Sequence, residues 1–190
     1  MQRTSFKDMA CSLARSLEIA GEWWTPLVLR DIWMGRTRFE EIQTNLDISR
    51  KLLAERLDTL VREGVLRRQR YETRPPRYEY RLTEKGEELM VVLLALLSWG
   101  DRWTAKKAGP PALIRHLGCG ETVEAEVKCS SCGEALRARD VLLEPGPGLK
   151  FGRGARPLPE RHPFHALSLE LAKRRRRTGA GRKARAATRR

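Results

Sequence analysis

Three of the four cysteines in this chain lie near a histidine, in residues 115–136. His116 and Cys119 form one H-x-x-C pair, Cys129 and Cys132 form one C-x-x-C pair, and nine residues separate the pairs. A glycine follows each pair, so a tight turn can point both side chains at one ion. Three thiols and one imidazole suit tetrahedral Zn²⁺, and four protein ligands leave no open position for catalysis. We therefore expect a structural zinc site in a small module that resembles a zinc ribbon.

Other chemistry remains open for these residues. Cys129 and Cys132 could form a metal-free redox dithiol, or the whole cluster could be inert. His162 and His165, in "RHPFH", compete with His116 as the fourth ligand. The chain lacks a thioredoxin-like βαβ context, paired catalytic carboxylates, a Ser-His-Asp set and a phosphate-cradling loop, so we expect no enzyme activity.

The charge of the chain points to a polyanionic partner. The formal net charge is +14 over 190 residues, and residues 173–190 alone carry ten Lys or Arg and no acid, which leaves +4 for the rest. A like-charged tail rich in Ala and Gly is expected to be disordered and to contact phosphates without sequence preference. The tail therefore favours nucleic acid as a partner but does not account for specific recognition.

The sequence shows no signal for export or membrane insertion. Residues 1–17 lack the continuous apolar region of a secretory signal. The longest apolar run, Leu89 to Leu97, has nine residues, about half of the ~20 that a spanning helix needs. We expect a cytoplasmic protein without a membrane partner.

The N-terminal half has the pattern of a helical domain. Apolar spacing and caps predict helices over residues 11–20, from Thr25 as N-cap to Gly35, around 39–46, and from Ser49 as N-cap to Glu63. Trp23 and Trp24 are expected in the core, with a ligand pocket as the alternative. The short link "DIS" between the last two helices is compatible with a helix-turn-helix.

A hairpin follows the last of these helices. Residues 65–71 and 78–83 alternate like short strands, and the prolines of "ETRPPR" are expected to break the ladder between them. Helix-turn-helix followed by hairpin predicts a mainly helical α+β fold, the winged helix. Its DNA-binding residues are expected at the start of the second helix of the helix-turn-helix and in the wing, namely Ser49, Arg50, Lys51, Ala54, Glu55, Arg74 and Arg77.

A long helix follows, capped by Thr83. Its nine-residue run is apolar all the way round, so the helix must be covered on more than one side. One face can pack on the winged-helix core, and a homodimer is expected to cover the other, with Trp99 and Trp103 at its interface; a monomer that buries the whole run is the alternative. For Arg56 we expect a structural role, paired with Glu63, rather than a DNA contact.

The order of motifs resembles a known family. "GEWWTPLVLRDI", "RFEEI", "ISRKLLAERLDTLVREGVLRR", "PPRYEYRLTEKG" and "LLSWGDRW" follow Cys11 as in the HxlR-type winged-helix transcriptional regulators of bacteria. The resemblance covers about residues 8–104. It implies a homodimer that binds double-stranded DNA, reading two half-sites about one helical turn apart, ~34 Å, with the helix after Ser49 in the major groove.

The same resemblance draws attention to Cys11. Many family members sense oxidants or electrophiles through one cysteine just before the first helix, which is the position of Cys11, although Ser12 stands where the family usually has proline. A thiol at a helix N-terminus is suited to such chemistry because the helix dipole favours the thiolate. A redox or small-molecule effector is therefore expected, with a small packing residue as the alternative for Cys11.

These observations divide the chain into five parts. We expect a winged-helix and dimerisation domain over 1–104, a linker over 105–112, the zinc-ribbon-like module over 113–143, a flexible connector over 144–172 and the basic tail over 173–190. The main competing interpretation is an architectural protein that binds nucleic acid without specificity through the tail and the zinc knuckle.

Overall fold

The computed structural model describes residues 5–149, 151–167, 169–170 and 173. The tail predicted over 173–190 therefore lies outside the described residues, apart from Lys173. Ile19–Ala138 form one compact unit, and the described residues before and after this stretch form a second. The first unit contains the predicted DNA-binding elements and both Cys/His pairs.

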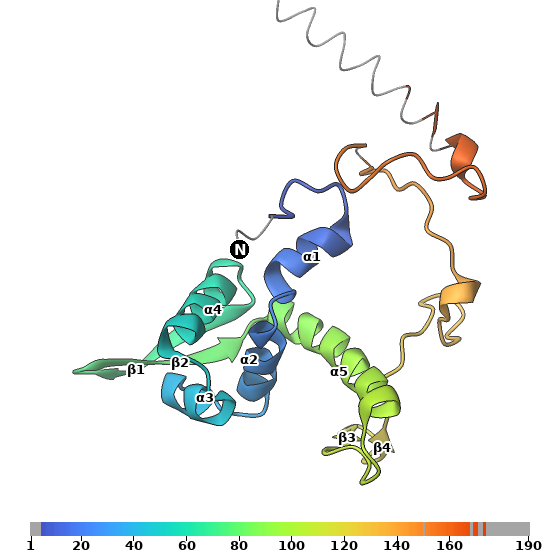
Figure 1. The fold of residues 1–190 in the computed structure, drawn as a ribbon. Coiled ribbons are helices and arrows are strands. Elements are labelled where there is room, and N and C mark those ends of the chain that lie inside the picture. The colour runs from blue at the N-terminus through green and yellow to red at the C-terminus, as the bar shows by residue number, and fades with distance from the viewer. Residues whose placement is uncertain (1–4, 150, 168, 171–172, 174–190) are drawn as a thin grey trace, which may run out of the picture. The chain divides into compact units, whose positions relative to one another are not determined.

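Four helices occupy the N-terminal part of the chain (Figure 1). They are α1 (Ser12–Ala20), α2 (Trp24–Trp33), α3 (Phe39–Leu46) and α4 (Arg50–Arg62). Ser49 caps α4 as expected, because its hydroxyl accepts a hydrogen bond from the Leu52 N–H at 3.3 Å. The prediction of Thr25 as N-cap is wrong, because the Thr25 N–H already bonds the Glu22 carbonyl at 3.0 Å and the helix starts at Trp24.

One apolar core joins these helices to the hairpin. Its centre is formed by buried side chains of α2, α3, α4, the α3–α4 turn and the first residues after α4, and Trp24 packs against it. The most deeply buried members are Val28, Leu29, Ile42, Leu53, Leu57 and Leu60. The apolar spacing therefore indicated the buried faces of α3 and α4, since residues three and four apart share one side of a helix. It was wrong for α1, where Leu13 and Leu17 are 69 and 42% exposed, and Trp23, which was expected in the core, is 90% exposed.

The hairpin consists of β1 (Leu66–Thr73) and β2 (Pro76–Leu82), paired antiparallel from Leu66↔Leu82 to Thr73↔Pro76. The expectation that the prolines break the ladder is wrong for its outer end. Pro76 lacks an N–H but stands at the first position of β2, where proline is tolerated. The base of the hairpin is anchored to the segment before α3, because the Tyr80 N–H donates to the Thr37 carbonyl at 2.8 Å.

Helix α5 (Glu84–Thr104) follows the hairpin directly. The Thr83 hydroxyl accepts from the Gly86 N–H at 3.2 Å, which confirms the predicted cap. Gly86 is required here because a Cβ would collide with the Val65 carbonyl oxygen. This helix is the longest in the described residues, and none of the described helices combines the length and apolar character needed to cross a bilayer.

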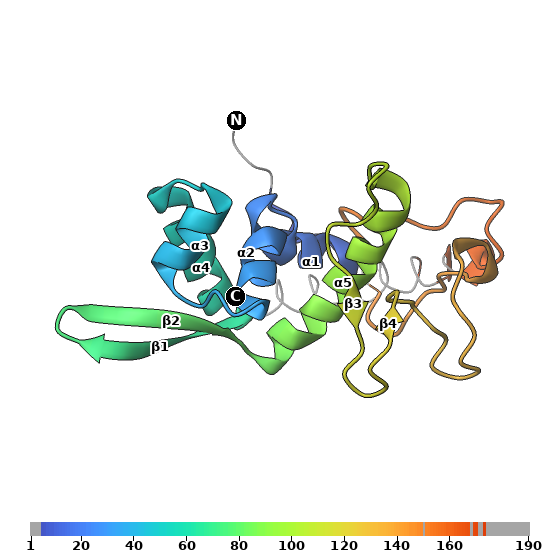
Figure 2. The ribbon, with the colours of Figure 1, turned by 90° about the horizontal axis from the view of Figure 1, so that it is seen from below.

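After α5 the chain forms only short elements. β3 (Ile114–Arg115) and β4 (Thr122–Val123) pair antiparallel, and the 3-10 helix η1 (Ala138–Asp140) ends this region. Figures 1 and 2 both show β3 and β4 beside the C-terminal half of α5. Two contacts fix them there: the Ala125 N–H donates to the Ser98 hydroxyl at 2.9 Å, and Arg102 pairs with Glu124 at 2.6 Å.

Candidate nucleic-acid interface

The first two turns of α4 carry the predicted contact residues on one open face. Ser49, Arg50, Lys51 and Glu55 are exposed and Ala54 is half-buried. On the opposite side of the same helix Leu53, Leu57 and Leu60 are at most 1% exposed. The helix is therefore held rigidly by its apolar face while its N-terminal polar face is free to enter a groove.

Helix α3 contacts the N-terminal face of α4 through Phe39. The Arg50 guanidinium lies over the Phe39 ring, 4.9 Å from its centroid, and Phe39 itself packs on the core. The turn between the two helices contains Asp47 in the left-handed region, at φ 50°, and the buried Ile48. Arg50 is thus presented at the surface by a fixed aromatic platform rather than by a free side chain.

A buried carboxylate ties α3 to α2. Asp31 has no exposed surface, and it accepts hydrogen bonds from Arg30 at 2.8 Å and from the Asn45 amide at 2.6 Å. Because a buried charge is tolerated only when its partners are in place, these contacts fix the angle between the two helices. This contact was not predicted, because Asp31 and Asn45 lie 14 residues apart in the sequence.

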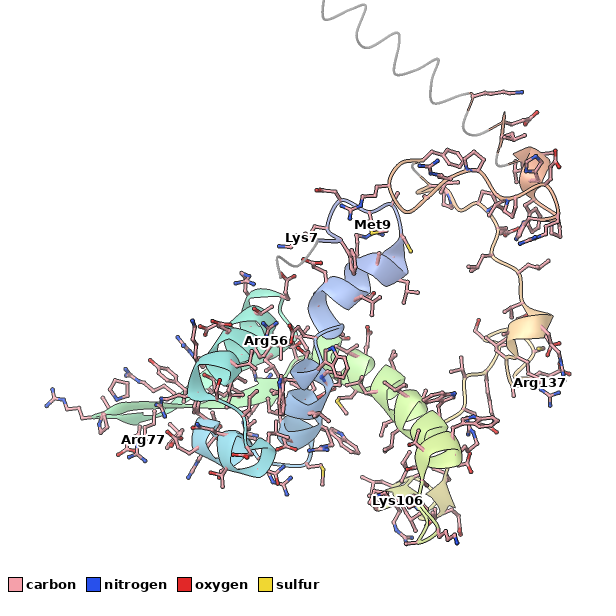
Figure 3. The ribbon with its side chains drawn as sticks, in the orientation of Figure 1. Lys7, Met9, Arg56, Arg77, Lys106 and Arg137 are labelled. Carbon is pink, nitrogen blue, oxygen red and sulfur yellow. The ribbon has the colours of Figure 1, made fainter. Side chains whose placement is uncertain are left out.

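The wing extends away from the helices as a long ribbon (Figures 1 and 2). Arg74 lies at its tip and is exposed. Arg77 lies on the hairpin (Figure 3) and forms an ion pair with Glu72 at 3.4 Å. Both predicted wing residues therefore stand on the strands or the tip of one exposed hairpin.

Besides Arg74 and Arg77, further arginines lie on the wing or against it. Arg38 stacks on Tyr71 at 4.4 Å and Arg68 on Tyr78 at 4.3 Å, measured to the ring centroids. Further arginines stand exposed along both strands, at 67, 70 and 81. The pattern "RRQR" in the first strand was the available signal. It makes the hairpin a basic surface along its length and not only at its tip.

Arg56 is a structural residue, but its expected partner is wrong. It lies 3.7 Å from the Glu22 carboxylate, while Glu63 pairs with Arg62 instead. The Arg56 side chain is 18% exposed, and its Nε is buried without a hydrogen-bond partner. Figure 3 shows Arg56 on the inner side of α4, away from the wing. Arg56 pairs with Glu22 because α4 packs against the segment before α2. The spacing of charges along α4 cannot predict this contact.

In the second unit, Cys11 immediately precedes α1. It is half-buried, and its carbonyl accepts from the Arg15 N–H at 3.1 Å, so Cys11 occupies the capping position of that helix. Cys11 therefore stands just before the first helix, the position at which the family resemblance leads us to expect a reactive cysteine.

The Cys/His pairs form two separate groups. His116 Nδ1 and Cys119 Sγ are 3.3 Å apart. Backbone N–H groups of Cys132 and Ser131, with a further contact from the Cys132 side chain, lower the pKa of the Cys129 thiol. Over the described residues no three His, Cys, Asp or Glu side chains gather as a metal would require.

Known proteins match this arrangement. A model of the HxlR-like helix-turn-helix family matches residues 19–108. The uncharacterized HTH-type transcriptional regulators Rv3095 of Mycobacterium tuberculosis and Mb3122 of Mycobacterium bovis are each 44% identical over 139 residues, 73% of this chain and 88% of the relative. A stretch of 139 residues within 190 must include residues 52–139, so the similarity extends beyond the wing into the cysteine-rich segment.

Solved structures agree with the fold. The crystal structure of PA1607 matches with a TM-score of 0.66 and 33% identity, over 74% of this chain and 99% of that chain. The structure of PA1374 from Pseudomonas aeruginosa matches with a TM-score of 0.52 and 37% identity, over 74% and 95%. With the helix-turn-helix, the basic wing and the long following helix in place, the chain belongs to the HxlR-like helix-turn-helix family.

Proposed function

We propose that this protein is a sequence-specific transcriptional regulator that binds double-stranded DNA as a homodimer. The observation that carries the proposal is the exposed polar N-terminal face of α4 above three fully buried leucines. In this proposal Arg50 and Lys51 reach base edges and phosphates in the major groove, and Ala54 meets a thymine methyl. The names of the mycobacterial relatives support transcription regulation as the role.

The wing supplies affinity and orientation in this proposal. An antiparallel ribbon lined by arginines suits phosphate contacts beside the groove occupied by α4, or entry into the minor groove. Arg74 at the tip and Arg77 on the strand are the proposed contacts. The Glu72 carboxylate beside Arg77 would be exchanged for a phosphate on binding.

A stripe on α5 supports the homodimer. Val92, Leu96, Trp99 and Trp103 follow one another at spacings of four, three and four, and their exposures are 62, 55, 52 and 73%. This spacing places them on one helical face, the pattern of a helix-to-helix seam. Met90 and Leu93, which lie about 160° and 100° around the helix from Val92, pack on the core, and Leu89 packs there too at the N-terminal end of α5. A second copy of α5 is the proposed cover for the stripe.

The dimer is tested by its oligomeric state. Leu96→Glu should convert the full chain to a monomer in sedimentation analysis, because a charge at the seam centre cannot be buried without a partner. Val91→Glu is the matched control, since Val91 is 64% exposed but lies about 100° around the helix from Val92. A Leu96→Glu protein that remains a dimer would exclude this stripe as the interface.

Cys11 is the proposed input of this regulator. A thiol at the capping position of α1 is accessible enough to react and is close to a helix N-terminus. An oxidant should change DNA binding of the wild-type chain and leave Cys11→Ser unaffected. Unchanged wild-type binding after thiol oxidation would remove Cys11 as a sensor and leave a small-molecule effector or none.

Genomic footprinting of the purified full chain tests the proposed specificity. It should protect defined sites with two half-sites, and deletion of residues 173–190 should lower affinity for all DNA while preserving the sites. If site preference disappears together with the tail, the protein is a nonspecific nucleic-acid binder, and the proposal fails.

A further inference from the structure

The cysteine-rich segment contains a short internal repeat. Residues 115–122, "RHLGCGET", and residues 128–135, "KCSSCGEA", correspond position by position: a basic residue, a metal-ligand residue, two spacers, a cysteine, a glycine, a glutamate and a small residue. The residues at the two ends of each stretch are paired, Arg115 with Thr122 and Lys128 with Ala135. Each stretch is therefore a small hairpin with a six-residue tip.

Both tips have the same backbone conformation. In the first, the His116 N–H donates to the Glu121 carbonyl at 2.9 Å and the Gly120 N–H donates to the His116 carbonyl at 2.8 Å. In the second, the Cys129 N–H donates to Glu134 at 2.8 Å and the Gly133 N–H donates to Cys129 at 2.9 Å.

The glycine at the fifth position of each tip has a positive φ, 75° for Gly120 and 78° for Gly133, which a side chain would strain. Two unrelated loops would not be expected to share the pairing, both hydrogen bonds and the glycine conformation. We therefore infer that the two turns have the same structural role.

Each turn brings two side chains that can ligate a metal close together. The imidazole Nδ1 of His116 lies 3.3 Å from the Cys119 sulfur. In the second turn, backbone N–H groups of Ser131 and Cys132 are directed at the Cys129 sulfur, with the Cys132 thiol beside it. One imidazole and three thiols in two turns make up the ligand set of a tetrahedral zinc site, in which backbone N–H groups hold the thiolates.

The segment has little apolar burial to hold it folded. Leu113, Leu117 and Val127 are 69, 92 and 60% exposed. The hydrogen bond and the ion pair that join it to α5 come from Ala125 and Glu124, just after the first hairpin. A segment this small without a core is usually stabilised by a metal or a disulfide.

We propose that the two turns close on one Zn²⁺ ion, with His116 and Cys119 from the first copy of the repeat and Cys129 and Cys132 from the second. Because the described residues hold the two pairs as separate groups, the ion must draw the turns together, and the nine residues between Cys119 and Cys129 give the chain the length to do so. The metal is structural and holds the segment against the C-terminal half of α5. This proposal does not depend on DNA binding.

Metal content of the full chain is the first test. Protein purified with reductant from zinc-supplemented cells should carry about one zinc per chain by native mass spectrometry and by zinc release to a colorimetric chelator. Single variants His116→Ala, Cys119→Ser, Cys129→Ser and Cys132→Ser should each lose it. Cys11→Ser is the matched control and should keep it, because Cys11 is the remaining cysteine and lies outside both turns.

Cobalt gives a readout that does not require a variant to fold. Co²⁺ added to the metal-free reduced wild type should produce the intense visible bands of tetrahedral thiolate coordination, and Zn²⁺ should displace them. Chelation of zinc from the wild type should expose Arg115, Lys128 and Arg137 to trypsin while the winged-helix unit stays intact.

Three outcomes would overturn the proposal. The first is that the wild-type protein, reduced and supplied with zinc, binds no zinc and gives no cobalt bands. The second is a Cys129–Cys132 disulfide under these same conditions. The third is a four-coordinate spectrum unchanged in His116→Ala but lost in His162→Ala, which would reject His116 as the fourth ligand.

Discussion

Arg50 should read a base, and a change to lysine tests this directly. The guanidinium is exposed in the first turn of α4 and is held over Phe39 at 4.9 Å. Arg50→Lys keeps the positive charge but removes the planar two-donor group and the stacking. The charge-driven part of DNA binding should therefore persist while the recognition of one base pair is weakened.

The contacts of Arg50 determine how much the change to lysine should alter DNA affinity and folding stability. Loss of a bidentate base contact costs about 1–3 kcal/mol, which corresponds to about 5- to 140-fold in affinity for the preferred site. The loss of an exposed cation–π contact costs about 0.5–1 kcal/mol of folding free energy, so the variant should still be folded. Affinity for random DNA and the dependence on salt should remain close to wild type, because the charge is unchanged.

The assay compares a site selected in vitro with a scrambled duplex, by fluorescence anisotropy at several salt concentrations. Arg102→Lys is the matched control, since Arg102 is an exposed arginine on α5 that forms an ion pair with Glu124. It should leave both affinities unchanged. If Arg50→Lys binds the selected site with wild-type affinity and preference, Arg50 does not read a base, and the assignment of the N-terminal face of α4 must be revised.

Three further predictions test other parts of the structure. Lys51→Ala should reduce the slope of log affinity against log salt by roughly 0.9 if Lys51 contacts one phosphate, whereas Lys106→Ala, at the far end of α5 in Figure 3, should not change it. Leu53→Ala should lower the free energy of unfolding in urea by about 2–5 kcal/mol, because Leu53 is fully buried. Leu96→Ala should weaken dimerisation more than it lowers this free energy, because Leu96 is 55% exposed on α5. Burial raises the pKa of the Tyr80 phenol. The stabilising contribution of the neutral phenol is therefore complete below the unfolded pKa of about 10 and is lost as pH rises through the higher folded pKa. Tyr80→Phe should remove this alkaline loss of stability in pH-dependent melting, and a variant with the same pH profile as the wild type would contradict the prediction.

The helices, and the caps of α4 and α5, could be predicted from the sequence because their causes are local. Ser49 and Thr83 each accept a hydrogen bond from an N–H three residues later, and the leucines of α4 repeat at helical spacing. The H-x-x-C and C-x-x-C pairs were also visible, since each spans four residues. The eight-residue repeat around them was present in the sequence but becomes convincing only when both copies have the same hydrogen bonds.

Contacts between distant segments could not be read in this way. Arg56 has Glu63 within reach along the sequence but pairs with Glu22, and Asp31 is satisfied by Asn45 from the next helix. The start of α2 was misplaced because a backbone hydrogen bond took the place of the expected Thr25 cap. The spacing of residues determined which faces are apolar and which ends are capped; tertiary packing alone decided the partners of buried charges, since these depend on which segments are brought together by the core.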